Sequence, residues 1–152
     1  MTDSPTALLP IALEAVTIAG DLMRSRLPGL LTPKGDRDMV TDIDYSIERA
    51  IRRHLRRTTP AISILGEEEG VTGHHDSAPM WTIDPVDGTA NFVRGIPLCG
   101  ISLGLIDKKK PVLGVIDLPF LGTRYSAAEN TGARLGDRRL QTSMTTELKV
   151  RV

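Results

Sequence analysis

Two aspartates stand close together at the end of a short apolar stretch. Trp81–Ile83 is typical of a β-strand, and Asp84 and Asp87 follow it, with Pro85 between them and Gly88 directly after. Proline favours an extended residue before it, and glycine allows a tight turn or a close approach to a ligand. Two like charges this close repel each other unless a cation lies between them. Hard oxygen ligands on a rigid turn suit Mg²⁺, which keeps its remaining positions for water and substrate phosphate.

A second acidic segment lies upstream. Ala61–Leu65 is predicted to be a strand, and it leads into the segment Gly66-Glu67-Glu68-Glu69-Gly70. A rigid strand can position the carboxylates that a glycine-rich loop presents. Each acidic segment alone has an ordinary explanation, as a turn or as a solvated loop. Together they favour a metal site with Glu67 as a ligand and with Glu68 and Glu69 on the surface or behind the ligands.

Three stretches resemble, in the same order, the motifs of the inositol monophosphatase family of Mg²⁺-dependent phosphatases. They are Val40-Thr41-Asp42-Ile43-Asp44, Gly66-Glu67-Glu68 and Asp84-Pro85-Val86-Asp87-Gly88-Thr89-Ala90-Asn91-Phe92. Ala90 stands where members of that family often carry Thr or Lys. The family's later Trp-Asp-x-Ala-Gly motif is absent, since Trp81 is the only tryptophan. The resemblance therefore predicts an N-terminal domain over residues 1–152, truncated before the family's C-terminal domain.

The resemblance implies a site with two Mg²⁺ ions. One ion would be held by Glu67, Asp84 and the carbonyl oxygen of Val86. Asp84 would bridge to a second ion that Asp87 also holds, and in the family a downstream aspartate completes this second position. Two cations ~3.5–4 Å apart can stabilise the attacking and the leaving oxygen of an in-line displacement.

The resemblance also implies roles at the substrate. Asp87 and the N–H groups of Gly88 and Thr89, at a helix N-terminus, would bind the substrate phosphate. Thr89 with Asp44, and Glu67, would orient and deprotonate the nucleophilic water. The pattern Thr41-x-x-Asp44 also fits a capping box, in which both side chains bind free backbone N–H groups. The two roles of Asp44 stay open and do not exclude each other.

These features predict hydrolysis of a small phosphate monoester with Mg²⁺ as cofactor. The resemblance points first to a polyol or sugar phosphate, with inositol monophosphate as the default substrate. Histidinol phosphate, fructose bisphosphate or a 3′-phosphonucleotide would use the same chemistry. An alternative of another class is a non-catalytic fragment that keeps the fold and binds a partner.

The composition narrows the classes of partner and location. The length of 152 residues suits one domain. Basic and acidic residues number 19 each, and this balance argues against nucleic acid or an anionic membrane as the main partner. The single cysteine, Cys99, cannot form an internal disulfide, which favours the cytoplasm. No stretch is expected to reach the ~18 apolar residues that a membrane span needs, and a homodimer stays open.

Two amphipathic helices are predicted in the first half of the chain. The first has apolar residues at spacings of three and four from Leu9 to Leu27, with Pro10 in its first turn. The second begins at Thr41 and has the apolar stripe Ile47, Ile51 and Leu55. Lys34, in the loop between the helices, lies near the metal site in the resembled family and is otherwise a solvated charge. Five arginines are expected mostly on the outer face of the second helix: Arg49, Arg52, Arg53, Arg56 and Arg57.

Strands are expected to dominate the second half. The predicted strands are Leu98–Ile106, Pro111–Leu118 and Thr123–Ala128, with Gly114 as a candidate bulge. The sequence therefore predicts an α+β protein with an antiparallel sheet flanked by helices. The resemblance implies the first part of the family's layered α-β-α-β-α fold.

Overall fold

The computed structural model describes residues 4–26, 31–33, 39–73 and 79–146, so Lys34 lies outside the described residues. The helices are α1 (Pro5–Ser25), α2 (Asp42–Thr58), α3 (Thr89–Val93) and the short 3-10 helix η1 (Pro119–Leu121). The strands are β1 (Leu31–Pro33), β2 (Met39–Thr41), β3 (Ser63–Gly66), β4 (Gly70–Thr72), β5 (Met80–Asp87), β6 (Gly100–Asp107), β7 (Lys110–Leu118), β8 (Thr123–Ala128), β9 (Gly132–Leu135) and β10 (Arg138–Arg139).

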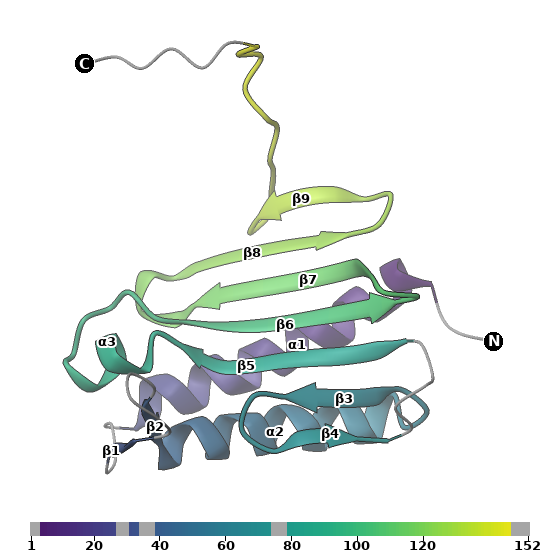
Figure 1. The fold of residues 1–152 in the computed structure, drawn as a ribbon. Helices are drawn as coiled ribbons and strands as arrows, with labels where there is room; N and C mark the ends of the chain where they lie inside the picture. Colours follow the sequence, from purple (N-terminus) through teal and green to yellow (C-terminus); the bar gives the residue numbers. More distant parts are fainter. Residues whose placement is uncertain (1–3, 27–30, 34–38, 74–78, 147–152) are drawn as a thin grey trace.

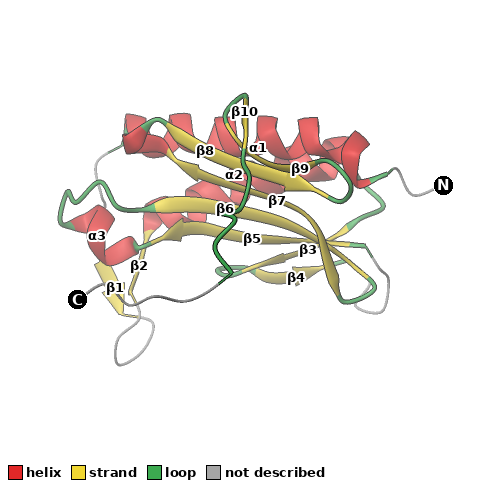
Figure 2. Cartoon of the chain, turned by 90° about the horizontal axis from the view of Figure 1, so that it is seen from above, coloured by secondary structure: helices red, strands yellow, loops and turns green. Residues whose placement is uncertain are grey.

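Eight of these strands form one sheet, in the order β10-β9-β8-β7-β6-β5-β3-β4, and β1 pairs with β2 in a separate hairpin. Neighbouring strands of the sheet run antiparallel except β3 and β5, which are parallel. The two long helices lie on the same face of the sheet (Figure 1), as the view from above also shows (Figure 2). The predicted α+β class is confirmed, and the parallel pair is a departure from the expected antiparallel pattern.

Helix α1 begins at a serine cap and a proline. The Ser4 hydroxyl accepts the N–H of Ala7, and Pro5 occupies the first turn, where its missing N–H costs nothing. Pro10 was predicted in the first turn, but it lies inside the helix, because the helix begins earlier than the apolar pattern suggested. The buried face also differs from the predicted stripe, since Leu9 is only half-buried. The buried residues are Leu8, Ala12, Ala15, Val16, Ala19, Gly20 and Met23.

Helix α1 also corrects the expectation about membrane spans. At 21 residues it is long and apolar enough to cross a membrane by length and composition. A core helix passes the same test, and the buried face of α1 packs against α2, β6 and β7. In the structure one face of α1 is therefore part of the core.

Helix α2 follows the prediction with one exception. Thr41 is its N-cap, and the stripe Ile47, Ile51 and Leu55 is fully buried. Four of the five arginines are exposed, as expected. Arg52 is 1% exposed, because its guanidinium group pairs with a buried carboxylate rather than with water.

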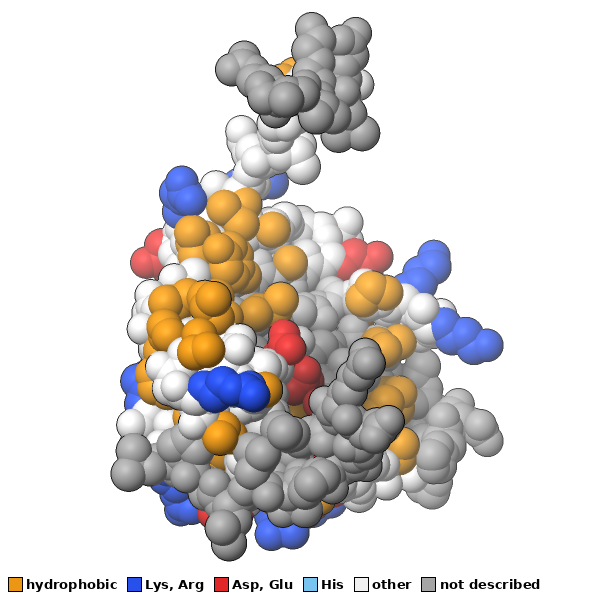
Figure 3. All heavy atoms as spheres, turned by 60° about the vertical axis from the view of Figure 1, so that its left-hand side comes forward, with side chains coloured by type: hydrophobic (Ala, Val, Ile, Leu, Met, Phe, Trp, Pro, Cys, Tyr) orange, Lys and Arg blue, Asp and Glu red, His pale blue; other side chains and the backbone are white. Residues whose placement is uncertain are grey.

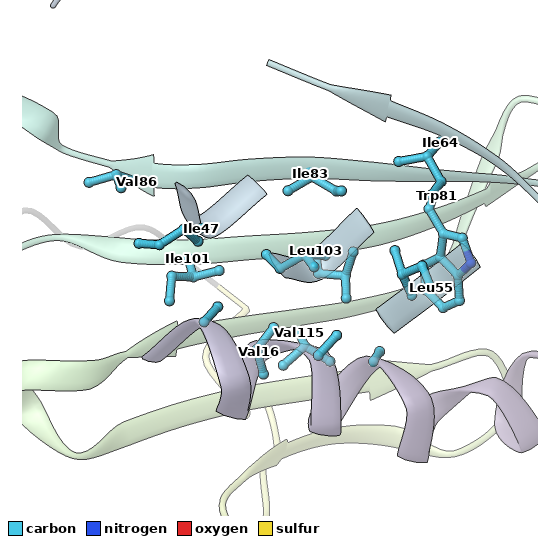
Figure 4. Close-up of a cluster of buried hydrophobic side chains, with 14 of the residues drawn as sticks. Val16, Ile47, Leu55, Ile64, Trp81, Ile83, Val86, Ile101, Leu103 and Val115 are labelled. Atoms are coloured by element: carbon cyan, nitrogen blue, oxygen red, sulfur yellow. The ribbon is translucent and has the colours of Figure 1, made fainter. Parts of the chain in front are cut away.

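The core lies between the helices and the sheet. Trp81 is fully buried in it, and its indole N–H donates to the Thr59 hydroxyl at 3.0 Å. Val16 of α1, Leu55 of α2 and Leu103 of β6 are among the side chains that fill this space (Figure 4). These contacts hold β5, which carries the aspartates, inside the sheet between β6 and β3.

The β6–β7 hairpin contains a bulge, though not at Gly114. Gly114 pairs regularly with Gly104. The register shifts between Leu105 and Ile106, whose partners are Leu113 and Pro111. The extra residue is therefore Val112, next to a proline that has no N–H for the ladder.

Candidate active site

The two predicted acidic segments meet where β3 and β5 end. The two strands are parallel, with Gly66 opposite Ile83. The Glu67 N–H donates to the Ile83 carbonyl oxygen at 3.1 Å, which places the backbone of Glu67 next to Asp84. The structure therefore brings together two of the three residues predicted to hold the first metal ion.

An irregularity in β5 brings the two aspartates to the same face of the sheet. Residues three apart in a regular strand point to opposite faces. Here Asp84 pairs with Ser102 and Asp87 pairs with Gly100, so three steps along β5 match two steps along β6. The extra residue makes a β-bulge, where the missing N–H of Pro85 is tolerated. Because Ser102 and Gly100 share a face of the sheet, Asp84 and Asp87 share it too.

Asp84 has a strongly perturbed carboxyl group. Burial, then the charge of Glu67, a hydrogen bond to Glu67 and the charge of Asp87 raise the pKa of Asp84 from 3.8 to about 7, and a hydrogen bond with the Val86 backbone opposes them. Its Oδ1 atom is buried without a hydrogen-bond partner in the described part of the chain. A divalent cation would satisfy this oxygen and offset the repulsion between the carboxylates. The residues present therefore fit a cation.

The carboxylates are not gathered into a closed metal cage. Among the residues that the structure describes, no group of three or more Asp, Glu, His or Cys side chains is placed to hold a metal ion. Glu67 and Asp87 are exposed, and acidic side chains lie near the centre of this end of the molecule, beside hydrophobic ones (Figure 3). Glu67 and Asp84 interact with each other, and the assignment of Glu67, Asp84, Val86 and Asp87 as metal ligands stays a prediction.

Thr89 and Asp44 are in direct contact. The Thr89 hydroxyl lies 2.9 Å from Asp44 Oδ1 and 3.0 Å from the Val86 carbonyl oxygen, and its single proton can be donated to one of them at a time. Asp44 is 2% exposed, and its Oδ2 atom accepts the Thr41 N–H at 2.9 Å and the Thr41 hydroxyl proton. Asp44 therefore caps α2 and binds Thr89 with different oxygens. The two predicted roles are geometrically compatible.

Gly88 makes the turn from β5 into α3. Its φ is 90°, and a Cβ there would lie 3.1 Å from the Leu98 carbonyl oxygen and 3.5 Å from Cys99. The helix that follows has only five residues, so its dipole is small. Binding of phosphate by Asp87 and by the N–H groups of Gly88 and Thr89 stays a prediction.

Two residues near the site were not expected from the sequence. Glu48 and Arg52 of α2 lie directly behind the turn that carries Glu67. The sequence pattern that could have indicated their pairing is an acidic residue four positions before a basic one, next to the apolar stripe of the helix. The many other arginines of this helix made a solvated face the simpler interpretation.

The pKa of Asp84 predicts how a divalent cation changes stability with pH. The carboxyl group of Asp84 keeps its proton up to about pH 7 in the folded chain, whereas in the unfolded chain it loses the proton near pH 3.8. The free energy of unfolding of the cation-free protein should therefore fall as the pH rises from about 3.8 to about 7. A cation binds the ionised form. Added Mg²⁺ should therefore raise the thermal midpoint more at about pH 8 than at about pH 5.5. Differential scanning fluorimetry measures this difference, and an equal shift at both pH values would contradict it.

Comparison with known proteins identifies a family of similar sequences. Residues 4–152 match the inositol monophosphatase family. The chain is 34% identical over 144 residues to inositol monophosphatase 2 of Solanum lycopersicum, covering 91% of this chain and 54% of that protein. It is 41% identical over 107 residues to a histidinol-phosphatase of Streptomyces coelicolor, covering 68% of this chain and 40% of that protein.

The fold has similar solved structures as well. The extragenic suppressor protein suhB of Bartonella henselae has a TM-score of 0.86 and 31% identity, with coverage of 91% of this chain and 55% of that one. The chain spans about half the length of the curated relatives that it matches.

Proposed function

Because this chain belongs to the inositol monophosphatase family, we propose that it forms the metal-binding part of a Mg²⁺-dependent phosphatase that hydrolyses a small polyol or sugar phosphate. The observation that carries the proposal is the environment of Asp84. Its carboxyl group has a pKa of about 7 and interacts with Glu67, and one of its oxygens is buried without a hydrogen-bond partner in the described residues. Such a carboxyl group is typical of a site in which a bound cation neutralises neighbouring carboxylates and satisfies their oxygen atoms.

In this proposal Glu67, which directly follows β3, and residues of β5 would hold the metal. Glu67, Asp84 and the Val86 carbonyl oxygen would hold one Mg²⁺, and Asp84 and Asp87 would hold a second. When bound, these ions supply Lewis acids for the phosphate and lower the pKa of water. Asp87 and the backbone N–H groups of Gly88 and Thr89 orient the phosphate.

Thr89, Asp44 and Glu67 then act on the water. Since the Thr89 hydroxyl gives its proton to Asp44 or to the Val86 carbonyl oxygen, its oxygen can accept a hydrogen bond from a water molecule. Asp44 is buried and fixed by Thr41, so its Oδ1 atom offers the hydroxyl an acceptor in a fixed position. Glu67 is the exposed carboxylate that can take the proton of that water.

The substrate is the least determined part of the proposal. Inositol monophosphate is the first candidate, because the family that matches residues 4–152 and the relative from Solanum lycopersicum are both named for its hydrolysis. Histidinol phosphate is supported by the relative from Streptomyces coelicolor, and fructose bisphosphate and a 3′-phosphonucleotide remain alternatives. A cytoplasmic location is part of the proposal, since Cys99 is a free thiol.

Phosphate release from these four substrates tests the proposal. We expect release that requires Mg²⁺ and stops with a chelator, because the candidate ligands are hard oxygen atoms. Since the chain spans about half of its relatives, residues 1–152 alone should be much slower than a chain extended to the full length of those relatives. Release that survives the chelator would contradict the metal site.

A second candidate is a partner-binding fragment without turnover. The half-length match and the lack of a closed cluster of metal ligands among the described residues favour it. No phosphate release from either form, together with specific capture of a protein partner, would support this alternative.

A further inference from the structure

A buried ion pair lies on the side of α2 that faces the Glu67 turn. The side chains of Glu48 and Arg52 are 0% and 1% exposed, and Arg52 Nε donates to Glu48 Oε1 at 2.7 Å. Removing two charges from water is costly unless hydrogen bonds satisfy both groups. The mechanism above uses neither residue, so the remaining contacts of the pair indicate what it does.

Glu48 binds the backbone of the turn between β3 and β4. Its Oε2 atom accepts the N–H of Glu68 at 2.8 Å, and its Oε1 atom accepts the N–H of Glu69 at 3.0 Å. One carboxylate therefore fixes two successive amides directly after Glu67. Hydrogen bonds to a charged acceptor are stronger than those between neutral groups.

Arg52 binds the other side of the same turn. Its guanidinium group donates to the Thr72 hydroxyl at 2.9 Å and to the Gly70 carbonyl oxygen. It also lies 3.7 Å from the carboxylate of Glu69. A planar guanidinium group can bind several acceptors in a fixed geometry, so Arg52 joins Glu48 to the strand that leaves the turn.

Gly66 provides the space for this pair. A Cβ on Gly66 would lie 2.0 Å from Glu48 Oε1 and 2.5 Å from Arg52 Nη2. Any side chain at this position would displace the ion pair. The glycine before Glu67 is thus required by the carboxylate behind it, although its φ is not in the left-handed region.

We propose that Glu48 and Arg52 are positioning residues that hold the turn from Glu67 to Gly70, so that the Glu67 carboxylate is presented to a cation beside Asp84. The backbone of Glu67 is tied to β5 through the Ile83 carbonyl oxygen, and the following amides are tied to α2 through Glu48. This inference rests on the proposed metal site. It extends that site by two residues that need not touch the metal or the substrate.

Replacing Arg52 with an uncharged residue distinguishes a positioning role from a purely electrostatic effect on cation binding. Removing a positive charge near a cation site should strengthen cation binding if charge alone matters. Removing a residue that positions a ligand should weaken it, and loss of residues behind metal ligands typically costs ~10–100-fold in metal affinity. The two effects have opposite signs for Arg52→Met.

The test uses the 152-residue chain with Mn²⁺ as the probe. Binding is followed by electron paramagnetic resonance, and amide hydrogen exchange is followed at Glu68 and Glu69. Asp117→Asn is the matched control, because Asp117 is also a buried carboxylate paired with an arginine, at 2.8 Å from Arg124, and it lies on β7. It should destabilise the chain without changing the turn.

We expect Arg52→Met to raise the Kd for Mn²⁺ by ~10-fold or more and to speed exchange at Glu68 and Glu69, while Asp117→Asn changes neither. Tighter or unchanged Mn²⁺ binding by folded Arg52→Met would overturn the proposal.

If Arg52→Met does not fold, the variant Thr72→Val tests the proposal instead, because it removes one contact of Arg52 without changing the charge. Thr72→Val should give faster exchange and weaker binding, and no change in either would overturn the proposal.

Comparing Mn²⁺ binding with phosphate release separates this inference from the proposed function. A wild-type chain that binds no Mn²⁺ would contradict the proposed metal site and with it the presentation of Glu67. Mn²⁺ binding by residues 1–152 without phosphate release by the extended chain would leave the positioning role standing and contradict only the proposed reaction.

Discussion

Replacing Asp84 with asparagine should reduce phosphate release to background and remove the response of the chain to Mg²⁺. The substitution keeps the volume of the side chain and removes the charge that would be shared between two ions. Its effect on cation affinity should exceed the ~100-fold upper range typical of residues behind the ligands. Phosphate release by the extended chain and Mn²⁺ binding by residues 1–152 measure the two effects.

The same substitution should not destabilise the cation-free protein. Burial and neighbouring carboxylates raise the pKa of Asp84 to about 7, so above that pH the ionised group opposes folding. Asp84→Asn should therefore unfold at an equal or higher temperature than the wild type at about pH 8 without metal. Asp107→Asn, in the hairpin between β6 and β7, is the control and should keep both turnover and the Mg²⁺ response. Turnover that survives Asp84→Asn would remove the basis of the metal site.

The elements that depend on local patterns were predictable from the sequence. The strand Thr123–Ala128 has the predicted bounds, and α2 begins after Thr41 with the predicted stripe buried. Capping residues and apolar periodicity act between near neighbours, so one segment contains the whole signal. The buried face of α1 is harder to predict from the sequence, because alanines rather than leucines form much of it.

The arrangement of the site could not be predicted from the sequence, because it depends on contacts between segments that are distant along the chain. The bulge that brings Asp84 and Asp87 to one face exists only in the register between β5 and β6. The parallel pairing of β3 with β5 places Glu67 beside Asp84, and no pattern within either strand specifies its partner. The expectation that the arginines of α2 lie mostly on its outer face fails at Arg52 for the same reason, since Gly70 and Thr72, two of its partners, lie about 20 residues away in sequence.

Replacing Thr89 with valine should lower the rate of phosphate release by ~10²–10⁴-fold, the usual contribution of a group that assists proton transfer. Valine has nearly the same shape as threonine but has no hydroxyl group to orient water. Thr89→Ser keeps that hydroxyl and should retain much of the rate. Mn²⁺ binding should be kept in both variants, because the Thr89 side chain is not among the predicted metal ligands.

A structural effect of Thr89→Val has to be separated from a catalytic one. Valine leaves the buried Asp44 Oδ1 without its donor at 2.9 Å, and an unsatisfied buried polar group costs ~1–3 kcal/mol. Thr59→Val is the matched control, because Thr59 is buried and its hydroxyl accepts the Trp81 indole N–H at 3.0 Å and donates to Leu55 at 2.9 Å. Both valine variants should lower the thermal midpoint, but only Thr89→Val should lower turnover well below the temperature of unfolding. If Thr89→Val turns over at the wild-type rate, the contact between Thr89 and Asp44 serves only to join α3 to α2.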